Sequence, residues 1–351
     1  MLALSGYQLG VQFRFFDPSA GAPVGQIGEL VAARYDDQRA LARFLEEVEV
    51  VTYEFESIPL EAVRFVSQHV AVYPPLAALE TAQDRLFEKE LFRDLGIPVP
   101  EFAAVNGIDE LRDAATRIGF PVVLKTRRMG YDGKGQVVIR DQASLREAWA
   151  TIGGAPLIVE QFVAFDHEFS VIGVRDTAGN HVFYPLAQNV HREGILRTTR
   201  VPAPDASDDM RRRAEGYCSA IMDRFNYVGV LALELFSSNG QLLANEMAPR
   251  VHNSGHWTIE GAETSQFENH LRAILSLPLG SAALRGWSAM VNIIGKIPPP
   301  ERVLGIRGVH LHLYGKAATE RRKLGHVTLV TESSEAAEEG LKTLTDAVRD
   351  A

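Results

Sequence analysis

The sequence has almost no cysteine, no long apolar run and no excess of basic residues. Cys218 is the only cysteine among 351 residues, which excludes an internal disulfide and a cysteine-based zinc cluster and fits a reducing cytoplasm. No apolar stretch reaches membrane-spanning length, and the opening segment MLALSGYQLG lacks the basic flank and cleavage site of a signal peptide. The formal charge of -9, with both signs mixed along the chain, leaves no basic surface for a phosphate backbone. We therefore expect a cytoplasmic protein with no nucleic-acid or membrane partner.

The N-terminal part of the chain alternates between strand and helix patterns. Apolar stretches at 11–16, 29–34 and 50–55 predict strands, and the spacing of apolar residues over 37–48 predicts a helix. This alternation is typical of an α/β domain. A further helix is predicted over 81–95, because a glycine and two prolines end its pattern.

Further along the chain the predicted strands become antiparallel. Turn signals at 177–180 and 238–240 predict hairpins, and an acidic helix is predicted at 335–350 after a series of short strands and glycine-rich turns. The fold class expected is α/β, or α+β for the chain as a whole. We expect three domains: a Rossmann-like domain at 1–80, a second domain at 81–280 with a lid subdomain at about 100–165, and a small β-rich domain at 281–351.

A glycine-rich loop lies between two predicted strands, from Lys125 to Gln136. Its glycines allow backbone N–H groups to approach a polyphosphate closely, and Lys125 supplies a matching cation. The loop is not a Walker loop, which would open a helix, and it is not a dinucleotide fingerprint, because a strand follows it. A flexible β-hairpin without a ligand would have the same spacing, so the loop alone does not decide the function.

Two glutamates, Glu234 and Glu246, occur in apolar strand patterns on either side of the turn at 238–240. A carboxylate in such a setting is costly unless a cation or another partner is near. A three-residue hairpin loop would project both side chains from the same face, whereas a two-residue turn would place them on opposite faces. Two carboxylates together with substrate phosphates commonly hold Mg²⁺. The alternative is a pair of glutamates on a solvated face.

The segment 247–258, directly after the second glutamate, is rich in hydrogen-bond donors and poor in aliphatic residues. Arg250 can clamp an oxyanion, His252 can donate or accept a proton, and Asn253 can bind a carboxylate or phosphate oxygen. His256, beside a tryptophan, is equally consistent with a structural histidine.

Together, GYDGKGQ (130–136), EQFV (160–163), the two-glutamate hairpin and NEMAPRVHNSGHWT (245–258) resemble the ATP-grasp enzymes, and within them the N5-carboxyaminoimidazole ribonucleotide synthetases. The resemblance runs over essentially the whole chain. It implies an ATP-grasp fold with a pre-ATP-grasp N-terminal domain. It also implies that ATP phosphorylates bicarbonate to carboxyphosphate, which then carboxylates 5-aminoimidazole ribonucleotide. The implied cofactors are ATP and Mg²⁺, with Mn²⁺ as a substitute, and the implied assembly is a homodimer.

The same resemblance assigns roles to individual residues. The residues implied to hold ATP are Arg85, Lys125, Gly130, Tyr131, Asp132, Gly133, Lys134, Gly135, Gln136, Glu160, Gln161, Phe162, Val163, Glu168, His191, Asn245 and Glu246. Glu234 and Glu246 are implied to bind the metal. The residues implied to surround bicarbonate and carboxyphosphate are Tyr131, Asp132, Arg250, His252 and Asn253. Glu54 matches a carboxylate near the acceptor amine, and Lys316, Arg322 and Lys323 suit the 5′-phosphate of the ribonucleotide.

One departure from the family pattern lies at the start of the chain. Relatives begin with a strand and a glycine-rich loop that lead into the helix on which this sequence starts, so we expect a truncated first domain and weak or absent activity. Two other functions fit the motifs: a formate-using glycinamide ribonucleotide transformylase and a catalytically silent ATP-binding protein. A nicotinamide oxidoreductase does not fit, because no G-x-G-x-x-G opens a helix after the first strand.

Overall fold

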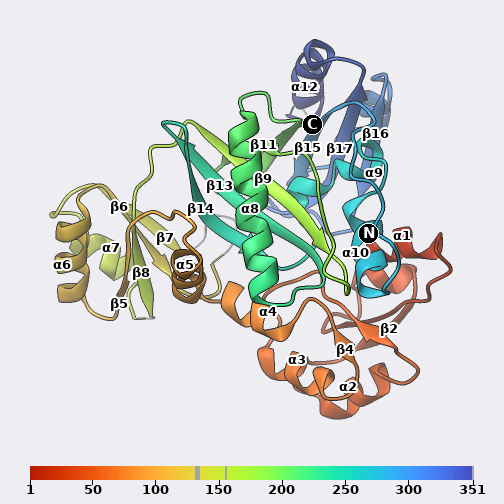
Figure 1. Cartoon of the computed structure of the whole chain (residues 1–351), viewed down its shortest axis with the longest axis horizontal. Helices are drawn as coiled ribbons and strands as arrows, with labels where there is room; N and C mark the ends of the chain where they lie inside the picture. Colours follow the sequence, from red (N-terminus) through yellow and green to blue (C-terminus); the bar gives the residue numbers. More distant parts are fainter. Residues whose placement is uncertain (131–134, 155, 350–351) are drawn as a thin grey trace.

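A computed structural model describes residues 1–130, 135–154 and 156–349 of the chain. Its central element is a nine-stranded antiparallel sheet in the order β14-β13-β9-β11-β12-β15-β17-β16, with β10 paired to β9 (Figure 1). The strands are β9 His167–Arg175, β10 His181–Phe183, β11 Ala187–Arg192, β12 Ile195–Val201, β13 Gly229–Ser238, β14 Gln241–Ala248, β15 Trp287–Ile294, β16 Val309–Leu313 and β17 Lys323–Thr331. The hairpins predicted at 177–180 and 238–240 are confirmed.

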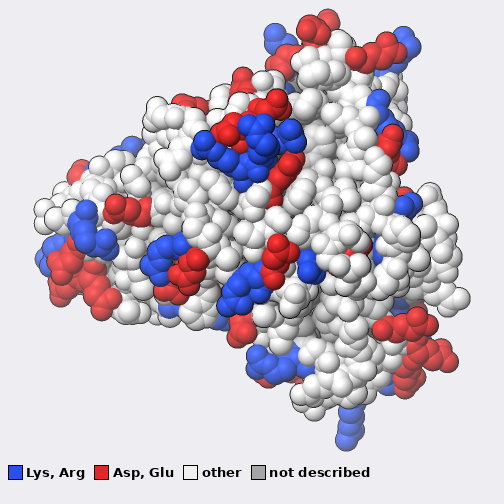
Figure 2. Space-filling model, viewed as in Figure 1, with Lys and Arg blue, Asp and Glu red and all other residues white. Residues whose placement is uncertain are grey.

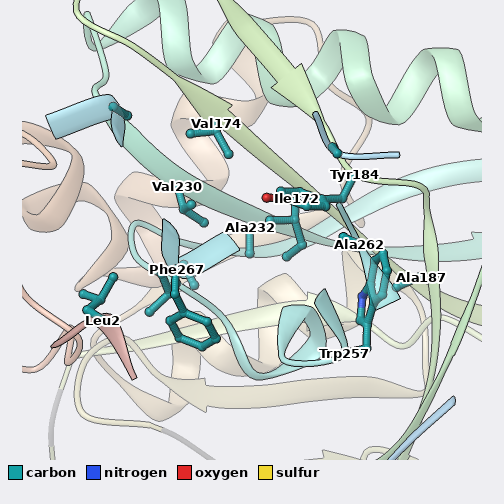
Figure 3. Close-up of a cluster of buried hydrophobic side chains, with 14 of the residues drawn as sticks. Leu2, Ile172, Val174, Tyr184, Ala187, Val230, Ala232, Trp257, Ala262 and Phe267 are labelled. Atoms are coloured by element: carbon teal, nitrogen blue, oxygen red, sulfur yellow. The ribbon is translucent and has the colours of Figure 1, made fainter. Parts of the chain in front are cut away.

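One helix covers each face of this sheet. Side chains alternate between the two faces along each strand, so both faces carry apolar residues that a helix buries. On β13, Leu231 and Leu233 pack in the cluster that contains Cys218 of α8 (Asp208–Arg224). Val230 and Ala232 instead face the cluster built around Phe267 of α10 (Gln266–Ile274) (Figure 3). Glu234 lies two residues after Ala232, so its side chain projects from the same face of the sheet, the one that α10 covers.

The C-terminal strands continue the central sheet. β15 pairs with β12 over four residues, from Thr198↔Val291 to Val201↔Ser288. Two helices, α11 (Pro300–Leu304) and α12 (Ser334–Arg349), accompany these strands, and buried residues such as Leu344 of α12 form a core with Val327 and Leu329 of β17. The division into domains at residue 280 stays a prediction, because the sheet runs across it without a break.

A smaller antiparallel sheet projects from one side of the molecule (Figure 1). Its order is β5-β8-β6-β7, with α6 and α7 packed on it around Leu111, Leu124 and Val159. Its elements are β5 Phe102–Val105, α6 Ile108–Ile118, β6 Val122–Thr126, β7 Gln136–Ile139, α7 Leu145–Ile152 and β8 Leu157–Gln161. These elements fall within residues 100–165, where the lid subdomain stays a prediction, and the glycine-rich loop connects β6 to β7 in the sequence.

The N-terminal part contains two short pairs of parallel strands, β1 with β2 and β3 with β4. Its elements are α1 Leu2–Tyr7, β1 Arg14–Asp17, the 3-10 helix η1 Pro23–Gln26, β2 Glu29–Ala32, α2 Gln38–Phe44, β3 Val50–Val51, α3 Leu60–Ser67, β4 Ala71–Val72 and α4 Leu76–Ala82. The strand expected over 50–55 is therefore much shorter. Helix α1 joins the main core through Leu2, which packs in the same cluster as Phe267 (Figure 3).

The helix predicted over 81–95 is two helices. α4 ends at Ala82, and α5 runs over Arg85–Asp94. Asp84 separates them because its side chain accepts a hydrogen bond from the backbone N–H of Leu86 at 3.1 Å, which caps a new helix rather than continuing the old one. The remaining short helices are η2 Asn253–Gly255 and α9 Thr258–Gly261.

Basic and acidic side chains are interspersed on the face in Figure 2. A group of arginines on α8 is balanced by neighbouring carboxylates, for example Arg211 with Glu215 and Arg213 with Asp209. Within the described ranges, none of the helices combines the length and apolar character that a bilayer-spanning segment needs.

Candidate active site

The hairpin of β13 and β14 places Glu234 directly opposite Glu246, so both side chains lie on the same face of the sheet. The turn has two residues, with Ser238 paired to Gln241 and positive φ angles at Asn239 and Gly240. Of the two loop lengths left open, the turn therefore has the shorter, and the expectation that a two-residue turn places the glutamates on opposite faces is wrong. A β-bulge shifts the pairing by one residue and so brings the two glutamates onto the same face. Leu235 pairs with Ala244, Glu234 pairs with Glu246, and Asn245 is the extra residue between them.

The two carboxylates differ in environment. The Glu234 side chain is 14% exposed, and burial together with the negative charge of Glu246 raises its pKa to about 7. Glu246 is 42% exposed and accepts a hydrogen bond from Nη1 of Arg85 at 3.0 Å. Burial alone would raise the pKa of Glu246, but the charge and hydrogen bond of Arg85 outweigh it and lower that pKa. Arg85 thus favours the ionised form of Glu246, whereas burial and the neighbouring charge disfavour the ionised form of Glu234.

Arg85 also joins this hairpin to the glycine-rich loop. Its Nη2 donates to the carbonyl of Gly130 at 3.2 Å, and its backbone N–H donates to the carbonyl of Arg127. Next to it, Asp84 forms ion pairs with Arg127 and Arg128 at 2.7 and 3.1 Å. The start of α5 therefore holds the strand end from which the loop leaves.

Two lysines share one buried carboxylate between the smaller sheet and α5. Nζ of Lys125 lies 2.9 Å from Oε2 of Glu160, and Nζ of Lys89 lies 3.4 Å from the same atom. Burial opposes the charge on Glu160, but the two ammonium groups prevail and lower its pKa to about 2. The other oxygen, Oε1, is buried and has no partner among the described residues. From Glu160 the chain continues to Gln161 and Phe162, which are exposed, and to the half-buried Val163.

Two histidines lie beside the glutamate pair. Nδ1 of His191 is 3.1 Å from Oε2 of Glu168; burial lowers the pKa of His191, but the hydrogen bond and nearby carboxylates raise it overall. Nε2 of His252 is 3.3 Å from Oε1 of Glu234. Burial and the charge of Arg250 hold the pKa of His252 well below its usual value, so this imidazole is neutral.

Hydrogen bonds select the tautomer of His252. Its Nδ1 accepts from the backbone N–H of Ser254 at 3.3 Å and lies 2.9 Å from the Ser254 hydroxyl. That hydroxyl in turn accepts from Ser170 at 2.7 Å. Nδ1 is therefore an acceptor, and Nε2 carries the proton that points to Glu234. The structure makes His252 a hydrogen-bond donor toward the space beside the glutamates.

The donor-rich segment after β14 reaches two other parts of the chain. Nη2 of Arg250 is 2.7 Å from Oε2 of Glu56, a glutamate of the N-terminal part. Glu54 lies elsewhere: its carboxylate accepts from the backbone N–H of Leu2 and is half-exposed near the chain start. The structure thus brings Glu56, rather than Glu54, to Arg250.

Asn253 is held by a reciprocal amide pair with Asn292 of β15, with N···O distances of 3.0 and 2.7 Å. Its Nδ2 also lies 3.3 Å from Nδ1 of His256, which is 3.0 Å from the hydroxyl of Tyr314. The Tyr314 hydroxyl is in turn 2.8 Å from Nδ1 of His326. His256, Tyr314 and His326 therefore form a hydrogen-bond network that holds the side chain of Asn253 in place.

Of the predicted phosphate-binding cations, Lys316 and Arg322 lie in the segment between β16 and β17, and Lys323 is the first residue of β17. Lys323 is near enough to the site that its charge contributes to the pKa values of Glu234 and His252. Lys316 lies over the ring of Tyr314, 5.3 Å from its centroid, and Arg322 donates to the carbonyl of Ala317. The structure thus brings Lys323 toward the glutamate pair.

Part of the predicted loop is described. Gly130 contacts Arg85, and Gln136 pairs with Lys125 across β6 and β7. Gly135 has a φ of 71°, and a Cβ there would lie 2.5 Å from Oγ1 of Thr126, so only glycine fits. Tyr131, Asp132, Gly133 and Lys134 lie outside the described residues.

Sequence reasoning missed Glu88 and Lys89, which are among the most buried charged residues of the chain, at 2% and 1% exposed. They follow Arg85 at the i+3 and i+4 positions, and the same helix face continues at Phe92 in the core. Charged residues on the otherwise apolar face of an amphipathic helix were the signal that could have found them.

Comparisons with known proteins agree with this architecture. Family models match residues 1–83 (ribonucleotide synthetase preATP-grasp domain), 90–267 (ATP-grasp domain) and 288–340 (phosphoribosylaminoimidazole carboxylase C-terminal domain). The chain is 51% identical over 329 residues to the N5-carboxyaminoimidazole ribonucleotide synthase of Pseudomonas aeruginosa, covering 94% of this chain and 91% of the relative.

Solved structures are similar over nearly the whole chain. The N5-carboxyaminoimidazole ribonucleotide synthetase of Thermus thermophilus matches with a TM-score of 0.96 and 53% identity, covering 99% of this chain and 95% of that one. The Aspergillus clavatus enzyme in complex with ADP and 5-aminoimidazole ribonucleotide matches with a TM-score of 0.91 and 30% identity, with the same coverage. The chain therefore belongs to the N5-carboxyaminoimidazole ribonucleotide synthase family of ATP-grasp enzymes.

Proposed function

We propose that this chain uses ATP to carboxylate 5-aminoimidazole ribonucleotide on its exocyclic amine, as a step of purine biosynthesis. In the first step an oxygen of bicarbonate attacks the γ-phosphorus of ATP, and the bond to the β-phosphate oxygen breaks to release ADP. In the second, the amine nitrogen attacks the carbon of carboxyphosphate, phosphate leaves, and the amine loses a proton. The observation that carries the proposal is the glutamate pair, Glu234 opposite Glu246, in a chain of this family. Arg85 pairs with Glu246, and the charge of Lys125 acts on the same carboxylate.

The donor set of the pair suits Mg²⁺. Mg²⁺ binds oxygen ligands and is usually held by one or two carboxylates together with substrate phosphates. Glu234 and Glu246 supply two carboxylates on one sheet face, and the raised pKa of Glu234 reflects a charge that burial and its neighbour leave uncompensated. When bound, the metal would neutralise charge on the phosphates during transfer.

We assign the phosphates of ATP to Arg85, Lys125 and the glycine-rich loop. Arg85 and Lys125 are both restrained by carboxylates, Glu246 and Glu160, so their charges are positioned before the ligand arrives. Oε1 of Glu160 is buried without a hydrogen-bond partner in the described part of the chain, which supports a ligand contact there, since a donor on the nucleotide would satisfy it. Glu168, Asn245 and the main chain at 160–163 are assigned to the rest of the nucleotide.

Arg250, His252 and Asn253 are assigned to bicarbonate and carboxyphosphate. The neutral Nε2–H tautomer of His252 can donate to an oxyanion without adding charge, and Arg250 can clamp one with two N–H groups. Tyr131 and Asp132 are predicted to join them from the loop. If this is correct, Tyr131→Phe and Asp132→Ala will lower the rate of carboxylation more than the affinity for ATP, whereas equal losses would make the loop a phosphate lid alone.

ADP release tests the reaction directly. The rate is expected to require bicarbonate, and to rise further with 5-aminoimidazole ribonucleotide, when ATP and Mg²⁺ are supplied. Formate in place of bicarbonate, with glycinamide ribonucleotide as acceptor, is the matched control for a transformylase. ATP binding without turnover under any of these conditions would instead favour a silent ATP-binding protein.

We further propose that the chain forms a homodimer through its first and third predicted domains, 1–80 and 281–351. Leu4 and Tyr7 of α1 and Leu304 of α11 are large apolar side chains that the single chain leaves exposed. Light scattering coupled to gel filtration measures the mass directly. A mass of one chain at micromolar concentration would overturn this proposal without affecting the assigned reaction.

A further inference from the structure

The bulge that aligns the two glutamates is contacted from outside the sheet by one helix. β14 is an edge strand of the central sheet, so among the residues that the structure describes no strand pairs with the backbone groups on its outer side. Nζ of Lys89 donates to the carbonyls of Ala244 and Asn245 at 3.1 and 2.8 Å. Oε1 of Glu88 accepts from the backbone N–H of Met247 at 2.7 Å. Side chains of consecutive residues of α5 therefore contact the backbone on both sides of Glu246.

The segment after α5 completes this contact. The backbone N–H of Ala244 donates to the carbonyl of Pro98 at 2.7 Å. Four backbone groups around the bulge are thus satisfied by α5 and the residues that follow it. Because a bulge leaves its extra residue unpaired in the ladder, these outside partners favour the bulged register over a regular two-residue hairpin, which would turn Glu246 away from Glu234.

The same helix contacts the base of the glycine-rich loop at its other end. Asp84, the N-cap of α5, pairs with Arg127 and Arg128, and Arg85 contacts Gly130. Arg85, Glu88 and Lys89 occupy i, i+3 and i+4, so they project from one face of the helix. The loop and the bulge are therefore fixed to one rigid element.

We propose that Glu88 and Lys89 are positioning residues that hold the β14 bulge in the register that places Glu246 opposite Glu234. Through α5 they set the spacing between the metal carboxylates and the stem of the phosphate loop. This inference rests on the proposed use of Glu234 and Glu246 as metal ligands. If Glu88 and Lys89 only stabilised the fold, their substitution would lower the unfolding temperature but leave the metal affinity of the folded protein unchanged.

Mn²⁺ binding tests the proposal without depending on turnover. The free Mn²⁺ signal in electron paramagnetic resonance gives the Mn²⁺ dissociation constant in the presence of a non-hydrolysable ATP analogue. Lys89→Met is expected to raise that constant at least tenfold, while the affinity for the analogue without metal changes less than threefold. Arg93→Met is the matched control, because it removes an exposed cation from the same helix; its Mn²⁺ affinity is expected to stay within twofold of the unmodified protein.

Glu88 supplies a second, independent test. Glu88→Gln keeps an oxygen acceptor for the N–H of Met247, whereas Glu88→Leu removes it, so only Glu88→Leu is expected to weaken Mn²⁺ binding. A folded Lys89→Met or Glu88→Leu protein with unchanged Mn²⁺ affinity would overturn the inference, and so would failure of both to fold. If Glu234→Gln also leaves Mn²⁺ binding unchanged, the proposed metal site itself is wrong. If Glu234→Gln weakens binding and the α5 variants do not, only this inference fails.

Discussion

Arg250 and Glu56 form an ion pair in which Nε and Nη2 of the arginine lie 2.8 and 2.7 Å from the same oxygen, Oε2. The pair joins the segment after β14 to the segment after β3. Because both guanidinium nitrogens share one carboxylate oxygen, an oxyanion that binds Arg250 competes with Glu56 for the same donors. Glu56 is therefore expected to tune the affinity of Arg250 for an anionic substrate.

Glu56→Gln should lower the KM for bicarbonate about two- to fivefold, because the competing charge is removed. Arg250→Met should raise the same KM at least tenfold. Steady-state ADP release at varied bicarbonate measures both, with Arg213→Met on α8 as an exposed control. A rise in KM of equal size in both variants would mean that Glu56 helps to bind the anion rather than compete with it.

Glu234→Gln and Glu246→Gln should each raise the Mg²⁺ concentration for half-maximal ADP release at least tenfold, because each removes one of two carboxylate ligands. Titration of Mg²⁺ at saturating ATP measures this. Glu338→Gln, which neutralises an exposed glutamate paired with Arg200, is the control. Unchanged Mg²⁺ requirements in both site variants would show that the metal is held by other groups.

Asp84→Ala should lower the free energy of unfolding by roughly 2–4 kcal/mol. Asp84 is almost fully buried and acts both as the cap of α5 and as the partner of two arginines. Asp84→Asn retains a capping oxygen but not the charge, so the difference between the two variants isolates the cap, about 1 kcal/mol. Urea unfolding monitored by circular dichroism gives both values. Identical losses would assign the whole effect to the ion pairs.

The buried His270 should make the folded state less stable at acid pH. Its Nδ1 accepts from the backbone N–H of Val230 at 3.1 Å, its Nε2 lies 2.7 Å from the Thr52 hydroxyl, and burial lowers its pKa to about 3. Between pH 6.5 and about 3 the unfolded chain binds a proton that the folded chain does not. Stability is therefore lost as the pH falls through this window, by up to about 1.4 kcal/mol per pH unit.

His270→Gln should reduce this slope, although other buried histidines such as His326 contribute in the same direction. Urea unfolding at several pH values between 4 and 7 measures the slope, and the comparison does not depend on the absolute stability of the variant. Parallel curves for the two proteins would exclude His270 as a source of the acid sensitivity.

The general architecture could be predicted from sequence because it depends on local patterns and motifs. Strand alternation, the glycine-rich loop and the donor-rich segment led to the fold class and family that the comparisons confirm. Sequence left open whether Glu234 and Glu246 share a face, because the loop length alone was considered and it is a bulge, not the turn, that places them together. A bulge depends on partners far away in the sequence, here Glu88 and Lys89, and no pattern within the hairpin reports them.

The contacts of single side chains were less predictable. Glu54 and Glu56 have equivalent local sequence environments, and only the folded chain shows which one meets Arg250, 194 residues away. The division of the predicted helix at Asp84 was in principle readable, since aspartate favours an N-cap over a helix interior. It was missed because apolar spacing continues across the break.

The pairing of β15 with β12 has a practical consequence for engineering. Sequence models treat residues 90–267 and 288–340 as separate modules, yet the C-terminal strands supply the neighbour that completes β12. A shortened form that ends near residue 285 would leave the backbone groups of β12 bare beside the buried Leu196 and Val201. Such an edge is a template for intermolecular pairing, so the isolated middle module is expected to aggregate more readily than the entire chain.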